Sequence, residues 1–275
     1  GELLRLLVNH PHVKVLSVVS SSGAGSPVAS THRDLEGFYQ GLQFESELEL
    51  KRFANFQSRI IFSSLPHGTS AREIAKVVAQ AEAEKIQIKV IDLSGDFRLQ
   101  NTSERQQHYP EAVADEALRT KFVYGLTENN RKNVSQAQFI ANPGCLASAC
   151  ALAVLPLTDK TFSGKIIFDA KTGSSGGGRT LADTMHHPFR HGNVNAYKVL
   201  EHRHEPEIRE ALGDLSGARI NTTFIPHLLP ISRGIFATAY LELERAVSTD
   251  ELRSRYRKFY EHSPFIRVRE TSPDL

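Results

Sequence analysis

The sequence has almost no net charge and no apolar run long enough to cross a membrane. Its 33 basic and 31 acidic side chains leave a formal charge of +2, which is too small to favour nucleic acid or an anionic membrane as a partner. We also do not expect the opening residues to be a signal peptide. Any attraction for an anionic substrate must therefore come from local groups.

Cysteine is scarce, with only Cys145 and Cys150 among 275 residues. Five positions apart on a predicted helix, the two cannot form a disulfide without distortion of the backbone. Free thiols indicate a reducing, cytoplasmic setting. Burial as a small apolar residue is the usual fate of a free cysteine, and we expect it for Cys150.

Internal repeats and low-complexity linkers are absent, and the first half of the chain alternates apolar runs with helical patterns. This alternation predicts an α/β fold with a Rossmann-like, doubly wound parallel sheet. Sheets of this type bind ligands at the carboxyl ends of their strands. The expected strands are 13–20, 59–65, 88–93 and 139–141, with helices at 2–10 and at 70–84, where Thr69 is the expected cap.

A second α+β domain is expected after residue 146, because strands become longer and crossover helices fewer. We place the domains at 1–146 and 147–275. The expected strands are 165–171, 222–225, 234–243 and 265–268, with helices at 146–155 and 248–262.

Both domains are expected to be incomplete. A strand and a glycine-rich turn normally precede the first helix of such a sheet, and here the helix predicted at 2–10 has neither before it. At the other end, the strand predicted at 265–268 leads into a turn with no closing element after it.

Cys145 is the strongest candidate for chemistry. The turn sequence Asn142-Pro143-Gly144 follows a predicted strand, and an apolar helix follows the turn. The sulfur therefore lies at a helix N-terminus, where unpaired N–H groups and the positive end of the dipole favour thiolate over thiol. This position predicts a nucleophile.

A group of polar residues at 197–207 could assist such a nucleophile. A histidine has an unperturbed pKa suited to proton transfer, and His202 and His204 would point the same way on an extended segment. A metal site that also uses His186 and His187 is the competing interpretation, but no carboxylate or cysteine spacing completes a known set of ligands.

Two further features could bind anions. The loop at 173–178 contains three successive glycines, Gly176 to Gly178, whose amides could form an anion nest. Arg179 and Arg233 could each bind a phosphate or carboxylate. Ser20 and Ser22 end the second predicted element of the sheet, where small hydroxyls tolerate the 2′-phosphate of NADP better than an acidic residue would.

Taken together, these segments resemble the N-acetyl-gamma-glutamyl-phosphate reductase family, which is related to the aspartate-semialdehyde dehydrogenases. The matching stretches occur in family order across the whole chain. They are residues 1–7, 65–68 (LPHG), 92–98 (DLSGDFR), 124–126, 142–145 (NPGC), 173–179, 202–208 (HRHEPEI) and 233–234.

The resemblance implies that Cys145 forms a thioester from a small-molecule acyl phosphate, which NADPH reduces to a semialdehyde in arginine biosynthesis. It implies His202 as the acid/base, with His204, Tyr197 and Glu207 lining the site. It places the cofactor against Gly1, Leu65, Pro66, Ser175 and Gly176, and it implies a homodimer or homotetramer joined through the second domain.

Two alternatives remain open from the sequence. The lysine-pathway relative reduces an aminoadipyl phosphate that is longer by one methylene, a difference worth only ~1–3 kcal/mol in a pocket. The chain could also be a non-catalytic fragment that serves as an assembly module.

Overall fold

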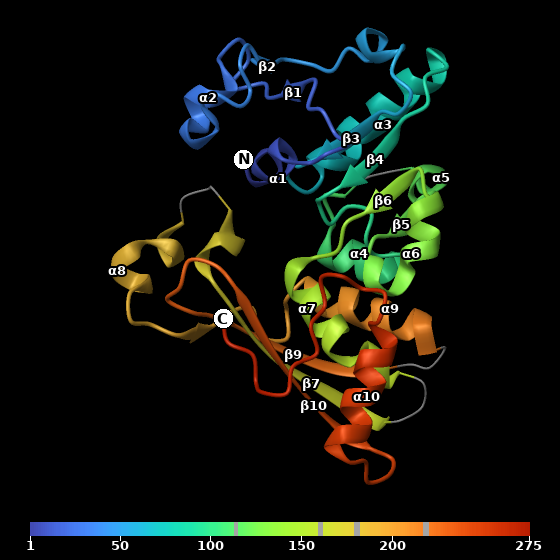
Figure 1. Cartoon of the computed structure of the whole chain (residues 1–275), viewed down its shortest axis with the longest axis vertical. Helices are drawn as coiled ribbons and strands as arrows, with labels where there is room; N and C mark the ends of the chain where they lie inside the picture. The colour runs from blue at the N-terminus through green and yellow to red at the C-terminus, as the bar shows by residue number, and fades with distance from the viewer. Residues whose placement is uncertain (113–114, 159–161, 179–181, 217–219) are drawn as a thin grey trace. The chain divides into compact units, whose positions relative to one another are not determined.

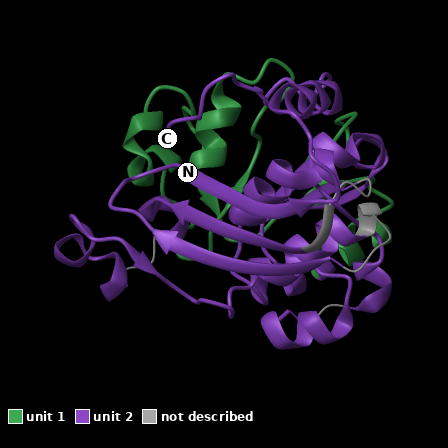
Figure 2. Ribbon diagram, turned by 90° about the horizontal axis from the view of Figure 1, so that it is seen from below, with its two compact units in different colours: residues 1–59, 76–88 green, residues 60–75, 89–275 purple. Residues whose placement is uncertain are grey.

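The structure, a computed structural model, describes residues 1–112, 115–158, 162–178, 182–216 and 220–275. The chain forms two compact units, shown in different colours in Figure 2. The first consists of residues 1–59 and 76–88, and the second of residues 60–75 and 89–275. Helix α3 (Thr69–Ala83) passes from the second unit into the first at Lys76.

The first unit contains short elements around a small apolar core. Leu4, Val28, Leu35 and Phe44 are buried against one another. The strand predicted at 13–20 is reduced to two residues, because only Val18 and Val19 have ladder partners among the described residues. They pair with Phe44 and Glu45, so the expectation that this strand belongs to the larger parallel sheet is wrong. The elements are α1 (Glu2–Val8), β1 (Val18–Val19), α2 (Val28–Thr31), β2 (Phe44–Glu45) and the 3-10 helices Arg33–Leu35 and Leu50–Phe53.

The second unit contains the predicted parallel sheet, in the strand order β3-β4-β6-β5. Its strands are β3 (Ile60–Ser63), β4 (Lys89–Asp92), β5 (Phe122–Tyr124) and β6 (Phe139–Ala141). Their registers align Ser63 with Asp92, Asp92 with Ala141, and Ala141 with Tyr124. The four carboxyl ends therefore lie in one row, from which the turns that carry the site begin.

A mixed sheet with the order β10-β7-β9-β8 completes the second unit and confirms the expected α+β arrangement. Helices α7 (Cys145–Val154) and α9 (His204–Ser216) pack on one face of it (Figure 1). Cys150 is fully buried between them and the sheet, as expected. The strands are β7 (Phe162–Thr172), β8 (Asn195–Ala196), β9 (Asn221–Leu228) and β10 (Ile235–Leu243).

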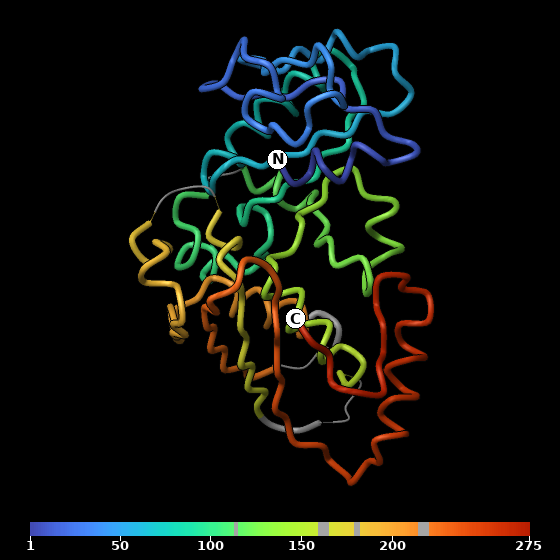
Figure 3. The backbone as a smooth tube through the Cα atoms, turned by 60° about the vertical axis from the view of Figure 1, so that its left-hand side comes forward, coloured from blue at the N-terminus to red at the C-terminus, as the bar shows by residue number. Residues whose placement is uncertain are grey.

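The C-terminal part of the chain packs against α7. Helix α10 (Thr249–Phe259) lies within the helix predicted at 248–262 and is capped by the Ser248 side chain. The prediction of a strand at 265–268 is wrong, because this segment has no strand partner among the described residues. Just after it, Glu270 forms an ion pair with Arg257 of α10. The chain then runs back until Leu275 contacts Gly234 (Figure 3).

Short helices make the remaining connections. None of the helices in the described part of the chain is long and apolar enough to cross a membrane. The elements are α4 (Thr102–His108), α5 (Glu116–Arg119), α6 (Thr127–Gln136), α8 (His187–Arg190) and the 3-10 helices Leu155–Leu157, Ser174–Gly177 and Asp183–Met185.

A buried carboxylate, rather than Thr69, caps the beginning of α3. Thr69 is the first helical residue, and the fully buried Asp96 accepts hydrogen bonds from the N–H groups of Gly68 (2.9 Å) and Ala71 (2.9 Å). Burial acts to raise the pKa of Asp96, but the His67 side chain and the hydrogen bonds from the Gly68 and Ala71 N–H groups together hold it below its usual value.

We predict that Asp96→Asn lowers the free energy of unfolding at neutral pH by about 1–3 kcal/mol, because charge-assisted hydrogen bonds to the helix are lost. A carboxylate with a lowered pKa in the folded state stabilises the protein above its unfolded pKa of about 3.9, and this stabilisation is lost as the pH falls through the folded value. Urea denaturation should therefore show a difference between the two proteins that shrinks in acid. The exposed cap variant Asp115→Asn serves as the control, and an equal effect of the two substitutions would contradict the interpretation.

Candidate active site

Cys145 is the first residue of α7, where the sequence places it. Strand β6 ends at Ala141, the turn 142–144 follows, and the Cys145 side chain is exposed. Gly144 is required in the turn, because a Cβ atom there would lie 2.4 Å from Nε2 of His204. The nucleophile candidate thus projects from a glycine that is closely packed against a histidine.

Glu207 binds the backbone of this turn through a hydrogen bond. One oxygen of its carboxylate, Oε1, accepts hydrogen bonds from the Gly144 N–H (2.6 Å) and from the Tyr124 hydroxyl (2.9 Å). The other oxygen lies 3.5 Å from Arg98. Glu207 is only 1 % exposed, so the expectation that it lines the substrate site is wrong: its oxygens are occupied by protein groups.

Arg98 joins two of the carboxyl ends of the parallel sheet. Its Nε donates to the carbonyl of Asn142 (2.7 Å), and its Nη2 donates to the carbonyl of Leu93 (2.9 Å). The guanidinium therefore connects the end of β4 to the turn that leads into Cys145. Its planar fork allows these bonds and the ion pair with Glu207 at once.

The two histidines of the predicted pair are adjacent, but not on an extended segment. Their ring centroids are 4.7 Å apart. His202 lies just before α9, and its Nδ1 accepts a hydrogen bond from the backbone N–H of His204, the first residue of that helix. Tyr197 packs edge-on against His202 with centroids 5.4 Å apart. The two rings are therefore adjacent because the chain turns into α9 at His204, and not because the residues alternate along a strand.

The electrostatics of Cys145 differ from expectation. Partial burial raises the pKa of its thiol, and this effect outweighs the backbone N–H groups of Leu146 and Cys145 and the charge of Arg98, which lower it. The N–H groups at the helix N-terminus thus lower the thiol pKa as expected, but the expected net preference for thiolate is not found, because the net pKa is raised. Desolvation of the charged form exceeds stabilisation by the dipole.

The aromatic and imidazole groups around the site are held neutral. Burial, together with the negative charge of Cys145, raises the pKa of Tyr197 to about 12, which indicates that the two groups are close. Burial also lowers the pKa of His202 to about 3, and burial together with the charge of Arg98 lowers that of His204 to about 3. Both rings are uncharged at neutral pH.

The glycine-rich loop packs against another loop instead of forming an open anion nest. The N–H groups of Ser174 and Ser175 donate to the carbonyls of Ile231 (2.9 Å) and Ser232 (2.9 Å). The expected nest concerned the amides of Gly176 to Gly178; those of Gly176 and Gly178 donate to the carbonyls of Gly173 (3.4 Å) and Ser175 (3.2 Å), so the expectation is wrong for these two amides. The contact brings the loop next to Arg233, since a Cβ on Gly173 would lie 2.9 Å from its backbone nitrogen. Ser175 and Gly176 are exposed, and Arg179 lies outside the described residues.

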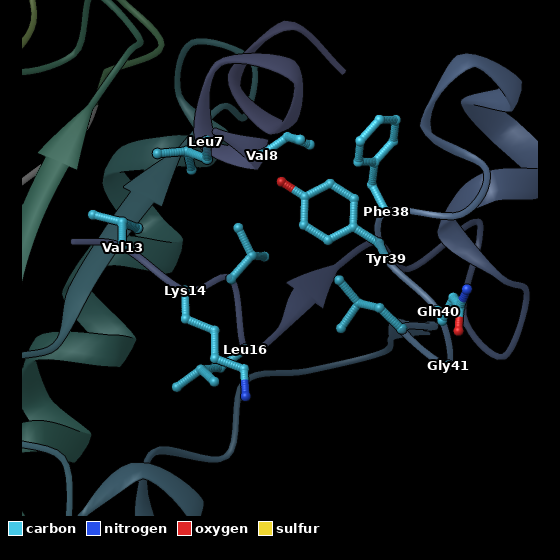
Figure 4. A pocket seen from close by; sticks show the side chains of 11 residues that line it. Leu7, Val8, Val13, Lys14, Leu16, Phe38, Tyr39, Gln40 and Gly41 are labelled. Carbon is cyan, nitrogen blue, oxygen red and sulfur yellow. The ribbon is translucent and has the colours of Figure 1, made fainter. Parts of the chain in front are cut away.

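The residues predicted to bind the rest of the cofactor are divided between the two units. Gly1 and Ser20 belong to the first unit, where Ser22 is exposed, and Leu65 and Pro66 are exposed in the second unit after β3. A pocket within the first unit is lined by apolar side chains of α1 and of residues 13–16 and 38–42, together with Lys14 (Figure 4). It contains none of the predicted site residues.

The alternative metal site gains no support from the described residues, which contain no group of three or more histidine, cysteine, aspartate or glutamate side chains placed to hold an ion. His186 and His187 are exposed and contact the rings of Phe189 and His191.

Two components of the site were not predicted, Arg98 and Tyr124. Each lies in a stretch that carries the family resemblance, but the partner that gives it a role, Glu207, is more than 80 positions away in the sequence. Besides the resemblance, the only signal was that Tyr124 lies at the carboxyl end of β5 and Arg98 in the segment that follows β4.

Known proteins are similar to both halves of the chain. Residues 1–137 match the family model for the NAD binding domain of semialdehyde dehydrogenases, and residues 145–275 match the model for their dimerisation domain. Proteins named N-acetyl-gamma-glutamyl-phosphate reductase are similar along the chain. That of Methanosarcina barkeri is 39% identical over 275 residues (100% of this chain, 77% of the relative), and that of Staphylococcus saprophyticus is 36% identical over 270 residues (98% and 75%).

Solved structures share the fold at low identity. Aspartate semialdehyde dehydrogenase II from Vibrio cholerae complexed with ASA has a TM-score of 0.63 at 14% identity and covers 95% of this chain and 74% of its own. The Candida albicans aspartate semialdehyde dehydrogenase with NADP has a TM-score of 0.58 at 15% identity, covering 92% and 71%. The chain belongs to the N-acetyl-gamma-glutamyl-phosphate reductase family, within the semialdehyde dehydrogenases.

Proposed function

We propose that this protein reduces N-acetyl-gamma-glutamyl phosphate to N-acetylglutamate semialdehyde in arginine biosynthesis, with Cys145 as the nucleophile. The observation that carries the proposal is the exposed sulfur at the first residue of α7, beside two neutral histidines and a half-buried tyrosine. The names of the similar relatives support this substrate over the aminoadipyl alternative.

Each step is assigned to groups of this chain. The Cys145 thiolate attacks the acyl carbon; a C–S bond forms, and the C–O bond to phosphate breaks as phosphate leaves with the electron pair. The nicotinamide cofactor, when bound, supplies the hydride that reduces the carbonyl. The C–S bond then breaks, which releases the aldehyde and restores the thiolate.

The negative charge that develops on the substrate oxygen needs donors. The N–H groups in the first turn of α7 lack helical acceptors by the geometry of a helix end, so they can stabilise this charge. His202 is the proposed acid/base. Because its Nδ1 accepts from the His204 N–H, the neutral ring carries its proton on Nε2 and acts through that atom.

Tyr197 and His204 are the proposed substrate contacts beside Cys145. Tyr197 interacts electrostatically with the sulfur, and His204 packs on Gly144. Arg233, next to the glycine-rich loop, is proposed to bind the anionic end of the substrate. Arg179 is proposed for the same role.

NADP is the proposed cofactor, which the match of residues 1–137 to the NAD binding domain of semialdehyde dehydrogenases supports. Its nicotinamide end is proposed at Ser175 and Gly176. Its adenosine end is proposed at Ser20 and Ser22 after β1 and at Leu65 and Pro66 after β3. Near Ser20, the Glu45 carboxylate is engaged by Ser17 (2.9 Å) and Arg52 (3.0 Å), which leaves the serine hydroxyls to meet a 2′-phosphate. The assigned residues are Gly1, Ser20, Ser22, Leu65, Pro66, Ser175 and Gly176.

The proposed function also implies a division of the chain into two domains and an assembly of several copies. Residues 1–146 form the cofactor domain and residues 147–275 the substrate domain, which the extents of the two family models support. We propose a homodimer or homotetramer assembled through the second domain and located in the cytoplasm.

The proposal is tested in the reverse direction by phosphate-dependent reduction of NADP with two aldehydes in parallel. N-acetylglutamate semialdehyde should be the preferred substrate by kcat/KM. A preference for the aminoadipate semialdehyde would reassign the substrate, and phosphate-independent reduction would reject acyl-phosphate chemistry.

We predict that Cys145→Ser lowers turnover by more than about a thousandfold, because a neutral hydroxyl replaces the thiolate nucleophile. NADPH binding, followed by enhancement of the cofactor's own fluorescence, should be unchanged. Cys150→Ala is the matched control, since Cys150 is buried in the core and should affect stability more than rate. Turnover retained in Cys145→Ser would remove this residue from the mechanism.

We predict that His202→Asn lowers kcat by about 10²- to 10⁴-fold, as expected for loss of an acid/base, and that His204→Asn acts more weakly. If His204→Asn is the more damaging of the two, the roles of the histidines are exchanged.

We predict that the pH profile of kcat/KM shows no titration near the ordinary histidine pKa of about 6.5. Burial lowers the pKa of both rings to about 3, so each stays neutral as the pH rises through that range. Because burial raises the pKa of the Cys145 thiol, kcat/KM should keep rising with pH beyond the ordinary thiol value of about 8.5. A plateau reached below neutral pH would contradict the raised thiol pKa.

A further inference from the structure

The buried groups next to Cys145 are connected to one another through the Glu207 carboxylate. We propose that Tyr124 and Glu207 are positioning residues: the Tyr124 hydroxyl and the Gly144 N–H share one carboxylate oxygen of Glu207, and this shared acceptor fixes the peptide from which Cys145 projects. The inference rests on the proposed role of Cys145 as nucleophile.

The Gly144 peptide is held from two directions by a single turn of helix. His204 and Glu207 lie three positions apart at the beginning of α9, so both side chains reach the same neighbour. The His204 ring packs where a Cβ of Gly144 would be, and the Glu207 carboxylate accepts its N–H at 2.6 Å. Movement of Gly144 toward the His204 ring is blocked by close contact. Rotation of its N–H away from Glu207 would break a buried hydrogen bond.

If either partner of the bond between Gly144 and Glu207 were lost, water could not take its place, because Glu207 is 1 % exposed and Gly144 is buried. A buried acceptor that loses its donor remains unsatisfied, at a cost larger than the net value of the bond. The geometry of the turn is therefore well determined only while the carboxylate and its donors are all present.

Tyr124 is the second short donor to the same oxygen. Arg98 is 3.5 Å from the other carboxylate oxygen and also bonds to two carbonyls, so it neutralises the charge without orienting Oε1 closely. The Tyr124 hydroxyl at 2.9 Å supplies that orientation. Tyr124 stands at the carboxyl end of β5, in register with Ala141, the last residue of β6 before the turn.

Tyr124→Phe removes only this hydroxyl and provides the test. The charged and titratable groups that act on Cys145 are Arg98, Glu207 and Tyr197. Without the hydroxyl, the Glu207 charge is less well compensated, so alkylation of Cys145 by iodoacetamide should reach half its maximal rate at a higher pH than in the wild type. We expect kcat to fall about tenfold with KM changed by less than about threefold.

Tyr260→Phe is the matched control. Its hydroxyl donates to the Leu152 carbonyl (2.6 Å) near the opposite end of α7, and the residue is buried. It also removes one buried tyrosine hydroxyl, here from a bond to α7 itself, and should lower resistance to urea to a similar extent, but the alkylation profile and kcat should not change. Equal shifts in the two variants would show a general loosening of α7 and overturn the proposal.

Glu207→Gln gives a shift of opposite sign. Removal of the negative charge should move the alkylation midpoint to lower pH, while kcat falls because the acceptor is weaker. If this variant does not fold, Tyr124→Phe alone decides. A wild-type alkylation profile and kcat in Tyr124→Phe would overturn the proposal. Alkylation requires no turnover, so its shift is judged separately from the reductase activity that tests the proposed function.

Discussion

The hydrogen bond from the Gly144 N–H to Glu207 is the constraint on which the rest of the site depends. It joins the turn after β6 to the first turn of α9, and thereby fixes where α7 begins. The parallel sheet makes this possible, because its carboxyl ends lie in one row and present Leu93, Tyr124 and Asn142 to the same buried carboxylate and its arginine. A buried charge is tolerated only with partners of this kind.

Two opposing effects act on the sulfur, and their balance explains why the thiol is not already ionised. The N–H groups of the first turn of α7 and Arg98 favour the thiolate, while burial and Glu207 disfavour it. The same Glu207 that positions the nucleophile thus suppresses its charge. A substrate with an anionic phosphate would not relieve this by itself, so ionisation of Cys145 has to be assisted by donors close to the sulfur rather than by long-range attraction.

Local features of the site were predictable from the sequence, and long-range ones were not. A strand, a turn with Pro143 and Gly144, and an apolar helix predict the position of Cys145 because each signal lies within a few residues of the next. The occupied amides of Ser174 and the buried role of Glu207 depend on partners 57 and 63 positions away. The same limit explains the cap of α3, where Asp96 replaced the local candidate Thr69.

The segment between Tyr197 and His202 shows how the two rings are kept together. Lys198 and Leu200 have φ values of 46° and 61°, in the left-handed backbone region that residues other than glycine rarely adopt. Such strain persists only where the surroundings determine it. Here one end is held by the bond from the Tyr197 N–H to the Pro226 carbonyl, and the other by the bond from the His204 N–H to His202. The two residues of this edge-on pair, Tyr197 and His202, are thus joined by a short segment of strained backbone whose two ends are both held by hydrogen bonds.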